Sequence, residues 1–175
     1  MFGKYNRYKV LKVFLDSPTQ EFGLREISRI AKLAPVSVLR YLREFEREEL
    51  IITLKKKDKP IYKAERENEN FIFYKRLSIL YELHNSGLVE YLWQKLAPQA
   101  LILYGSHAKG ESTENSDIDI FVIGKKEEIE LNKFKNFFGK EIHIIFDSDF
   151  KEIPKELKNN LINGIILKGY LKLFR

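Results

Sequence analysis

The first fifty residues repeat apolar positions at the spacing of amphipathic helices. Three short helices are predicted there, over residues 6–15, 24–32 and 35–50, each with its apolar side chains three or four positions apart. Pro18 follows the first helix and ends it, because proline disfavours the helical conformation in the residue before it. Pro35 opens the third helix, since a proline in the first turn costs no hydrogen bond.

Two short apolar runs, residues 51–54 and 60–64, predict a β-hairpin after the third helix. The segment between them, Lys55-Lys-Lys-Asp-Lys59, makes the tip of this hairpin basic. Beyond the hairpin the helical pattern resumes over residues 71–85 and 88–96. We interpret these two helices as a connector.

From Pro98 onward the pattern alternates between strands and helices. In chain order we expect a strand at 99–104, a helix at 107–111, a strand at 117–123, a helix at 126–138, a strand at 140–146, a helix at 154–163 and a short apolar run at 165–168. This arrangement predicts a second, separate core in the C-terminal half of the chain.

Composition narrows the class of protein. The chain of 175 residues has no cysteine, which excludes disulfides and thiolate metal sites. Its apolar runs are far shorter than the roughly 18 residues of a membrane span, and its first residues lack the apolar core of a signal peptide. We therefore expect a cytoplasmic protein without a membrane segment.

Positive charge is concentrated at the N-terminal end. Residues 1–66 contain 16 Lys and Arg against nine Asp and Glu, a net charge of +7, whereas residues 67–175 have a net charge of −1. This asymmetry indicates a polyanionic partner for the N-terminal part.

Asp117 and Asp119 stand one residue apart at the start of a predicted strand. Because side chains in a strand alternate between faces, both carboxylates project to one side while Ile118 and Ile120 point into a core. Two adjacent acidic groups repel each other, and a divalent cation is the usual reason that a strand keeps them. Mg²⁺ fits best, since it prefers a few carboxylates together with water and substrate phosphates.

Gly105 and Ser106 lie where the preceding strand is expected to turn into a helix. Exposed backbone N–H groups and a hydroxyl at such a turn can hold a phosphate. Together with the two aspartates, this turn suits phosphoryl or nucleotidyl transfer.

These motifs, Tyr104-Gly-Ser-His-Ala-Lys-Gly110 followed by Ser116-Asp-Ile-Asp119, resemble those of the polymerase-beta-type nucleotidyltransferase superfamily. The close form is similar to the minimal nucleotidyltransferases of archaea and bacteria, and the resemblance runs from about Pro98 to the C-terminus. It implies that Ser106 contacts the triphosphate of a bound NTP and that Asp117 and Asp119 hold two Mg²⁺ ions. Lys109 either assists as a cation or is simply solvated.

The same family uses a third acidic residue on a later strand, where it helps to deprotonate the attacking hydroxyl. In this chain that position falls on His143, a departure from the family pattern. Glu141 and His143 share the strand face that the two aspartates would use. An imidazole is a poor Mg²⁺ ligand, but His143 could act as a base, and Glu141 could supply the missing oxygen. The other interpretation is that the site is degenerate.

Residues 5–66 resemble the winged helix-turn-helix domain of archaeal and bacterial transcriptional regulators, through Leu24 to Ala31, Pro35 to Leu42 and the apolar close at Leu50 to Ile52. The resemblance implies that the helix starting at Pro35 enters the major groove and that the hairpin contacts the minor groove or phosphates. The candidate DNA-binding residues are Ser37, Arg40, Tyr41 and Arg43 on the helix and Lys55, Lys56, Lys57 and Lys59 in the hairpin. The alternative is a winged helix used for protein contact, with its lysines solvated.

The expected fold is therefore α+β. A winged helix-turn-helix domain (1–66) is followed by a helical connector (67–97) and a small mixed-sheet nucleotidyltransferase domain (98–175).

Two functions remain open. One is a DNA-binding protein with a Mg²⁺-dependent site that transfers a nucleotidyl group from an NTP to an acceptor hydroxyl. The resemblance to minimal nucleotidyltransferases implies a small helical toxin-like partner protein as the first candidate acceptor. The other is a transcriptional regulator whose degenerate, non-catalytic nucleotidyltransferase domain senses a nucleotide or binds a partner. In both cases we expect duplex DNA as a ligand, and a homodimer would read two half-sites.

Overall fold

The structure is a computed structural model that describes residues 5–148 and 153–171. In these residues it has eight helices and seven strands, which form two small sheets. The chain divides into two compact units, residues 1–78 and 79–175, each with its own apolar core. Within the described residues, no helix combines the length and the apolar character needed to cross a membrane.

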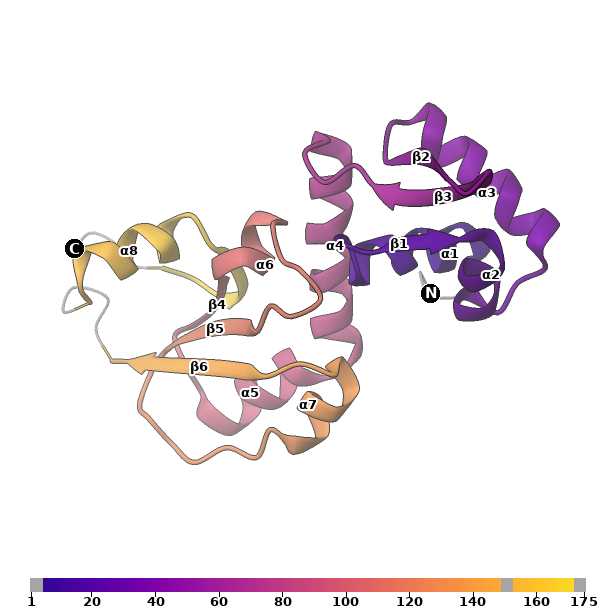
Figure 1. Ribbon diagram of the computed structural model, residues 1–175. Coiled ribbons are helices and arrows are strands. Elements are labelled where there is room, and N and C mark those ends of the chain that lie inside the picture. Colours follow the sequence, from indigo (N-terminus) through magenta and orange to yellow (C-terminus); the bar gives the residue numbers. More distant parts are fainter. Residues whose placement is uncertain (1–4, 149–152, 172–175) are drawn as a thin grey trace. The chain divides into compact units, whose positions relative to one another are not determined.

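The first unit combines a three-helix arrangement with a three-stranded antiparallel sheet (Figure 1). Its elements are α1 (Asn6–Asp16), β1 (Glu21–Gly23), α2 (Leu24–Ala31), α3 (Pro35–Arg47), β2 (Ile51–Lys56), β3 (Lys59–Ala64) and the first half of α4 (Glu69–Asn85). The strand order is β1-β3-β2. The predicted helices and hairpin are confirmed to within about three residues. The sequence analysis missed β1, whose three residues are too few to show a period.

The core of this unit is built from the apolar faces that the helical spacing predicts. Val38, Leu42 and Phe45 on α3 are buried against residues of α1 and α2. Phe14 on α1 meets Phe22 on β1 edge to face, with ring centroids 5.7 Å apart, a favoured geometry for an aromatic pair. This packing leaves the other face of α3 exposed to solvent.

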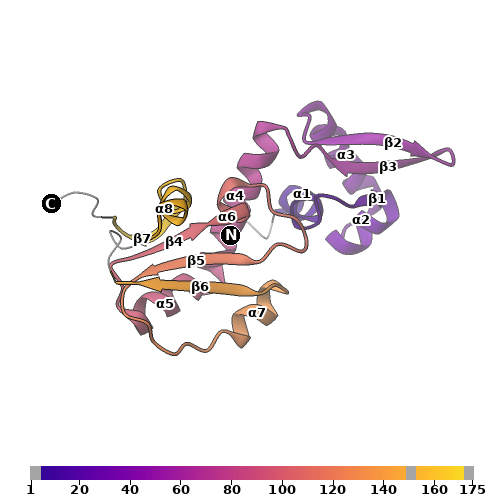
Figure 2. The same ribbon diagram turned by 60° about the vertical axis from the view of Figure 1, so that its left-hand side comes forward.

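The second unit is a mixed four-stranded sheet with helices on both faces (Figure 2). After the second half of α4, its elements are α5 (Leu88–Leu96), β4 (Ala100–Tyr104), α6 (Gly105–Lys109), β5 (Ile118–Ile123), α7 (Asn132–Phe138), β6 (Ile142–Asp147), α8 (Lys155–Ile162) and β7 (Ile165–Gly169). The strand order is β6-β5-β4-β7. β5 runs parallel to β6, and β4 is antiparallel to both β5 and β7.

The alternation of side chains along β5 divides the core of this unit into two layers. Ile118, Ile120 and Val122 pack on the side of α5 and α7, whereas Phe121 and Ile123 pack with Leu161 of α8. Figure 2 shows α5 and α7 on one side of the sheet and α8 on the other. Because Asp119 shares the face of Phe121, its carboxylate lies on the α8 side of the sheet.

Two predicted helices of this unit begin elsewhere than expected. The predicted helix over residues 126–138 begins only at Asn132, because the segment before it is mostly charged and exposed, and only Ile129 and Leu131 reach the core. The helix expected from residue 107 already begins at Gly105.

Candidate functional site

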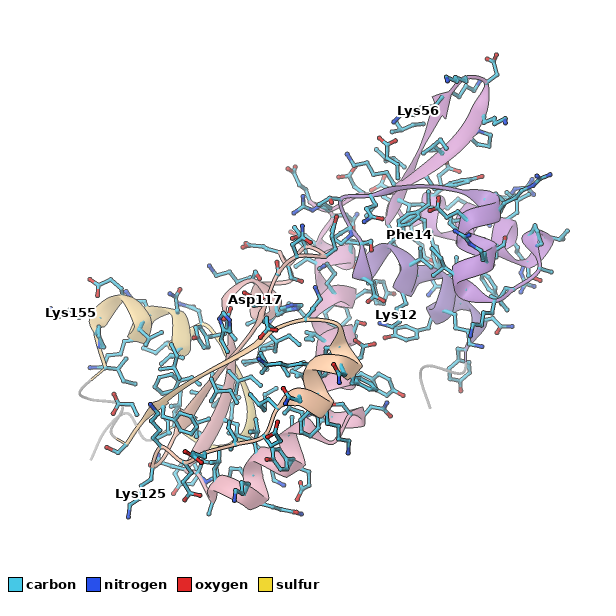
Figure 3. All side chains as sticks on the ribbon, turned by 60° about the horizontal axis from the view of Figure 1, so that its bottom comes forward. Lys12, Phe14, Lys56, Asp117, Lys125 and Lys155 are labelled. Atoms are coloured by element: carbon cyan, nitrogen blue, oxygen red, sulfur yellow. The ribbon has the colours of Figure 1, made fainter. Side chains whose placement is uncertain are left out.

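The two aspartates stand at the beginning of β5, in the middle of the sheet. Asp117 is the last residue before the strand, and Asp119 lies within it, opposite Tyr104 of β4 and His143 of β6. Their side chains are 45% and 28% exposed, while Ile118 between them is fully buried. Figure 3 marks Asp117 where the chain enters the sheet. Both carboxylates are therefore open to a ligand from solvent.

The imidazole of His143 lies between these carboxylates. Its Nε2 is 3.8 Å from Oδ2 of Asp117, and its Nδ1 is 3.8 Å from Oδ1 of Asp119. These distances exceed a direct hydrogen bond, but they place both ring nitrogens within reach of the carboxylates through a small movement. The parallel register of β5 and β6 produces this arrangement, since it sets Asp119 beside His143.

Glu141 lies beside the same strand but directs its carboxylate elsewhere. Its Oε2 pairs with Nζ of Lys135 on α7 at 2.5 Å, while its backbone carbonyl accepts a hydrogen bond from the N–H of Ile118 at 2.9 Å. The backbone of Glu141 thus joins the start of β5, and its side chain is paired outside the aspartate cluster.

The Gly-Ser turn lies directly against the Asp119 carboxylate. Gly105 has a φ of +70°, a conformation that favours glycine, and a Cβ atom added there would come within 2.5 Å of Oδ2 of Asp119. Ser106 is half-buried in the first turn of α6, and Lys109 is exposed at its last residue. The fold therefore brings the candidate phosphate-binding turn and the candidate metal ligand together.

The surroundings of Asp119 disfavour its charge. Burial raises the pKa of Asp119, the neighbouring His143 opposes that effect, and the charge of Asp117 raises the pKa further. Burial, and then Asp119 itself, raise the pKa of the Tyr104 hydroxyl across the strand pair. A cation bound between the two aspartates would relieve these unfavourable effects.

Asp119→Asn is expected to stabilise the metal-free protein at neutral pH. The pKa of Asp119 is higher in the folded than in the unfolded state. Its contribution to the free energy of unfolding is therefore fully present below the ordinary pKa of an aspartate and is lost as pH rises through the pKa of the folded state. Asparagine keeps the shape without the charge. Urea unfolding in the presence of a chelator should show a higher free energy of unfolding for the variant at pH 7, and the gain should shrink toward pH 4.

Asp58→Asn, in the exposed hairpin turn, is the control for removing one carboxylate. A variant Asp119→Asn that is less stable than the wild type at pH 7 would contradict the unfavourable surroundings of this carboxylate.

The donor set fits Mg²⁺ only if further ligands come from outside the protein. Among the described residues, no three or more His, Asp and Glu side chains form a group that would hold a metal ion. Mg²⁺ is commonly bound by one or two carboxylates, with water and substrate phosphates completing six ligands. Asp117 and Asp119 match that partial set, and the adjacent turn is where phosphates would enter.

Two side chains that the sequence analysis did not single out contact the loop before Asp117. His107, on α6, and Lys140, just before β6, both reach backbone carbonyls of that loop. Lys140 lies two residues before β6, and the sequence has no signal for either contact, because a backbone carbonyl partner has no sequence signature.

The candidate DNA-binding residues of α3 differ in their exposure to solvent, and Tyr41 packs against the core of the unit. Arg40 and Arg43 are exposed, whereas Ser37 and Tyr41 are half-buried. Arg40 donates a hydrogen bond of 2.9 Å to the Tyr41 hydroxyl and places its guanidinium 4.8 Å from the centroid of that ring. The two side chains thus form one aromatic and cationic surface.

The hairpin lysines gather at its tip. Lys55 and Lys56 lie on β2 and Lys59 on β3, with Lys57 in the turn. Lys56 faces Lys59 directly across the strand pair and also pairs with Glu21 of β1; Figure 3 labels Lys56 on this hairpin. Like charges directly opposite each other destabilise a hairpin. Glu21 offsets the charge of Lys56, while Lys55, Lys57 and Lys59 remain exposed at the tip.

Comparison with known proteins bears on the second unit. Residues 87–171 match the family model described as Polymerase beta, Nucleotidyltransferase, and this span runs from α5 to β7 and contains the Gly-Ser turn and both aspartates. No curated protein and no solved structure matches the chain. The match supports the predicted nucleotidyltransferase domain in the C-terminal half: residues 87–171 are similar to the polymerase-beta-type nucleotidyltransferases.

Proposed function

We propose that the second unit is an active, Mg²⁺-dependent nucleotidyltransferase that uses an NTP and an acceptor hydroxyl. The proposal rests above all on the contact between the Gly105 turn and the Asp119 carboxylate. That contact brings a phosphate-binding backbone next to a pair of carboxylates that are open to solvent. The pairing of Tyr104 with Asp119 across β4 and β5 sets Gly105 at this position, so the turn and the carboxylates form one site.

In the reaction, the acceptor oxygen attacks the α-phosphorus and the bond from that phosphorus to the β-phosphate oxygen breaks, so that pyrophosphate leaves. Mg²⁺ held by Asp117 and Asp119 would neutralise charge on the transferring group and on pyrophosphate. The backbone of Gly105 and the hydroxyl of Ser106 hold the triphosphate, and Lys109 adds a positive charge on the same helix. These residues orient the substrate, which accounts for much of the catalysis in such reactions.

The proton of the acceptor hydroxyl goes to His143 in this proposal. A base must lie within reach of the reacting group, and the His143 ring lies between the two aspartates. Glu141 is the weaker candidate because its carboxylate pairs with Lys135.

A transfer assay with α-labelled NTPs, Mg²⁺ and candidate partner proteins tests this assignment. His143→Ala should lower the transfer of label by about 10²–10⁴-fold, the usual contribution of a general base, while Glu141→Gln should keep most of it. The opposite pattern would make Glu141 the base. Full transfer by the double variant Glu141→Gln, His143→Ala would remove this strand from the active site.

The alternative function, a regulator with a non-catalytic domain, has a test of its own. His143→Asp restores the acidic residue that the family pattern has at this position. If the wild type is silent in the transfer assay and His143→Asp is active, the natural protein has lost catalysis and kept the pocket. We expect the wild type itself to transfer label, at a low rate.

For the first unit we propose DNA binding through a winged helix-turn-helix. The unit has three helices and a hairpin with a basic tip, and Arg40 and Arg43 are exposed on α3. The specific observation that favours a polyanion is the group of exposed lysines at the hairpin tip, Lys55, Lys57 and Lys59. Lysine contacts to phosphates would release counterions and make binding depend on salt.

Lys57→Asn in the full chain tests the hairpin without unfolding it. Lys57 has a φ of +48°, which asparagine tolerates better than lysine does, so the variant should remain as stable as the wild type. If Lys57 contacts a phosphate, the slope of log affinity against log salt should fall by about one, measured on duplex DNA by fluorescence anisotropy. Lys155→Asn, exposed on α8, is the control, and equal slopes for wild type and Lys57→Asn would exclude the contact.

A further inference from the structure

The loop that carries the chain from α6 to β5 ends at Asp117 and is internally bonded. The N–H of Thr113 donates to Oγ of Ser116 at 2.8 Å, and the N–H of Ser116 donates to the carbonyl of Thr113 at 3.2 Å. These bonds shape the turn locally. They do not connect it to the sheet, so other contacts must fix the position of Asp117.

Lys140 makes that connection from the segment before β6. Its Nζ donates to the carbonyl oxygens of Thr113 at 3.1 Å, Glu114 at 2.7 Å and Ser116 at 3.2 Å. An ammonium group has three N–H donors and no acceptor, so three converging carbonyls match it. The side chain is half-buried, which strengthens these charge-assisted bonds relative to an exposed lysine.

A second contact reaches the same loop from α6. His107, which is buried and follows Ser106 directly, places its Nε2 3.4 Å from the carbonyl oxygen of Ser116. That carbonyl belongs to the peptide bond that carries the N–H of Asp117. His107, next to the Gly-Ser turn, and Lys140, before β6, thus both contact the peptide group that precedes Asp117.

Asp117 needs such contacts because the sheet does not hold it. Strand pairing fixes Asp119 between Tyr104 and His143, whereas Asp117 lies outside β5. Two neighbouring carboxylates repel each other until a cation binds. Without contacts from outside β5, the Asp117 carboxylate would turn away from that of Asp119. The two carboxylates would then have to be brought together again each time a cation binds.

We propose that Lys140 is a positioning residue that presets Asp117 for metal-dependent nucleotide binding, with His107 as a second contact at the same carbonyl. This inference rests on the proposed function of the second unit. In this proposal Lys140 does not contact the substrate. Lys140 acts through the backbone of residues 113–116, as outer partners of metal ligands do.

The test compares Lys140→Met with the wild type and with Lys126→Met, an exposed lysine in the loop after β5. ATP is titrated by calorimetry with Mn²⁺ and, separately, with a chelator. Lys140→Met should lower the affinity for ATP in Mn²⁺ by about tenfold, the lower end of the effect of losing an outer partner of a metal ligand. Its affinity in chelator should not change, and Lys126→Met should match the wild type in both.

Hydrogen exchange of the metal-free proteins supplies an independent readout. The amides of residues 113–118 should exchange faster in Lys140→Met than in the wild type, while those of β4 should not. Lys140→Gln keeps an amide NH₂ group as donor, so it should lose less Mn²⁺–ATP affinity than Lys140→Met. It replaces the methionine variant in the comparison if that variant does not fold.

Equal Mn²⁺–ATP affinity of a folded Lys140 variant and the wild type would overturn the positioning role alone. Equal losses in Mn²⁺ and in chelator would also overturn it, because they would indicate a general structural defect. A wild type that binds none of ATP, GTP, CTP and UTP in Mn²⁺ would overturn both this inference and the proposed function; if it binds another NTP but not ATP, that NTP replaces ATP in the comparison.

Discussion

Gly105→Ala is expected to abolish nucleotide binding and to destabilise the second unit. The added Cβ would come within 2.5 Å of Oδ2 of Asp119, and the residue would keep a φ of +70°. The backbone conformation alone costs about 1–2 kcal/mol for a residue with a Cβ atom. Displacement of the Asp119 carboxylate adds to that cost and removes the contact on which the site depends. Urea unfolding and calorimetry with Mg²⁺ and ATP measure the two effects.

Gly87→Ala separates backbone strain from the effect on the site. Gly87 has a φ of +79°, but nothing lies within 4 Å of a Cβ atom built there. This variant should lose about 1–2 kcal/mol of stability and keep its nucleotide affinity. If Gly105→Ala binds nucleotide as well as Gly87→Ala does, the turn does not belong to the site.

The double variant Asp117→Asn, Asp119→Asn is expected to lose nucleotidyl transfer by at least ~100-fold, because losing a single outer partner of a metal ligand already costs up to that factor. This variant loses both ligands themselves. Asparagine keeps the size of both side chains but removes the charges that hold a divalent cation. The fold should persist, since neither carboxylate is buried in the core. Release of pyrophosphate and transfer of label from an α-labelled NTP are the measurements.

A matched control removes two carboxylates elsewhere in the same unit. Glu127 and Glu128 are adjacent and exposed in the segment between β5 and α7, so Glu127→Gln, Glu128→Gln changes the net charge equally. This control should transfer label like the wild type. Persistent transfer by the aspartate variant would show that the two aspartates are not metal ligands.

The sequence predicts the elements of this fold well where one face of an element is buried. The apolar period of α3 and the alternation in β5 are visible in the residues themselves, and Pro35 marks a helix start at the residue where the structure has it. The prediction of a helix or strand is wrong where the buried side chains do not recur at a regular spacing. The segment before Asn132 has helix-forming charged residues but only two side chains that pack on the core, so it stays outside the helix.

Only part of the candidate site could be predicted from the sequence. The two-residue period predicts that Asp117 and Asp119 share a face, and the pairing of β5 with β6 sets His143 beside Asp119. The pairing of Glu141 with Lys135 depends on where α7 ends, which the sequence pattern does not fix. Lys140 and His107 bind backbone carbonyls, which every residue possesses, so the sequence alone contains no signal for these contacts.

Calorimetric titration of the wild-type protein with an NTP, in Mg²⁺ and in chelator, tests most directly whether the second unit binds nucleotide through a metal. ATP, GTP, CTP and UTP are titrated separately, because the residues of the site do not specify a base. At least one of them should bind more tightly in Mg²⁺ than in chelator, because its phosphates complete the coordination of the metal, and Asp117→Asn, Asp119→Asn should erase that difference. Equal affinity in Mg²⁺ and in chelator for every NTP, or no binding at all, would contradict a metal-dependent nucleotidyl-transfer site on this sheet.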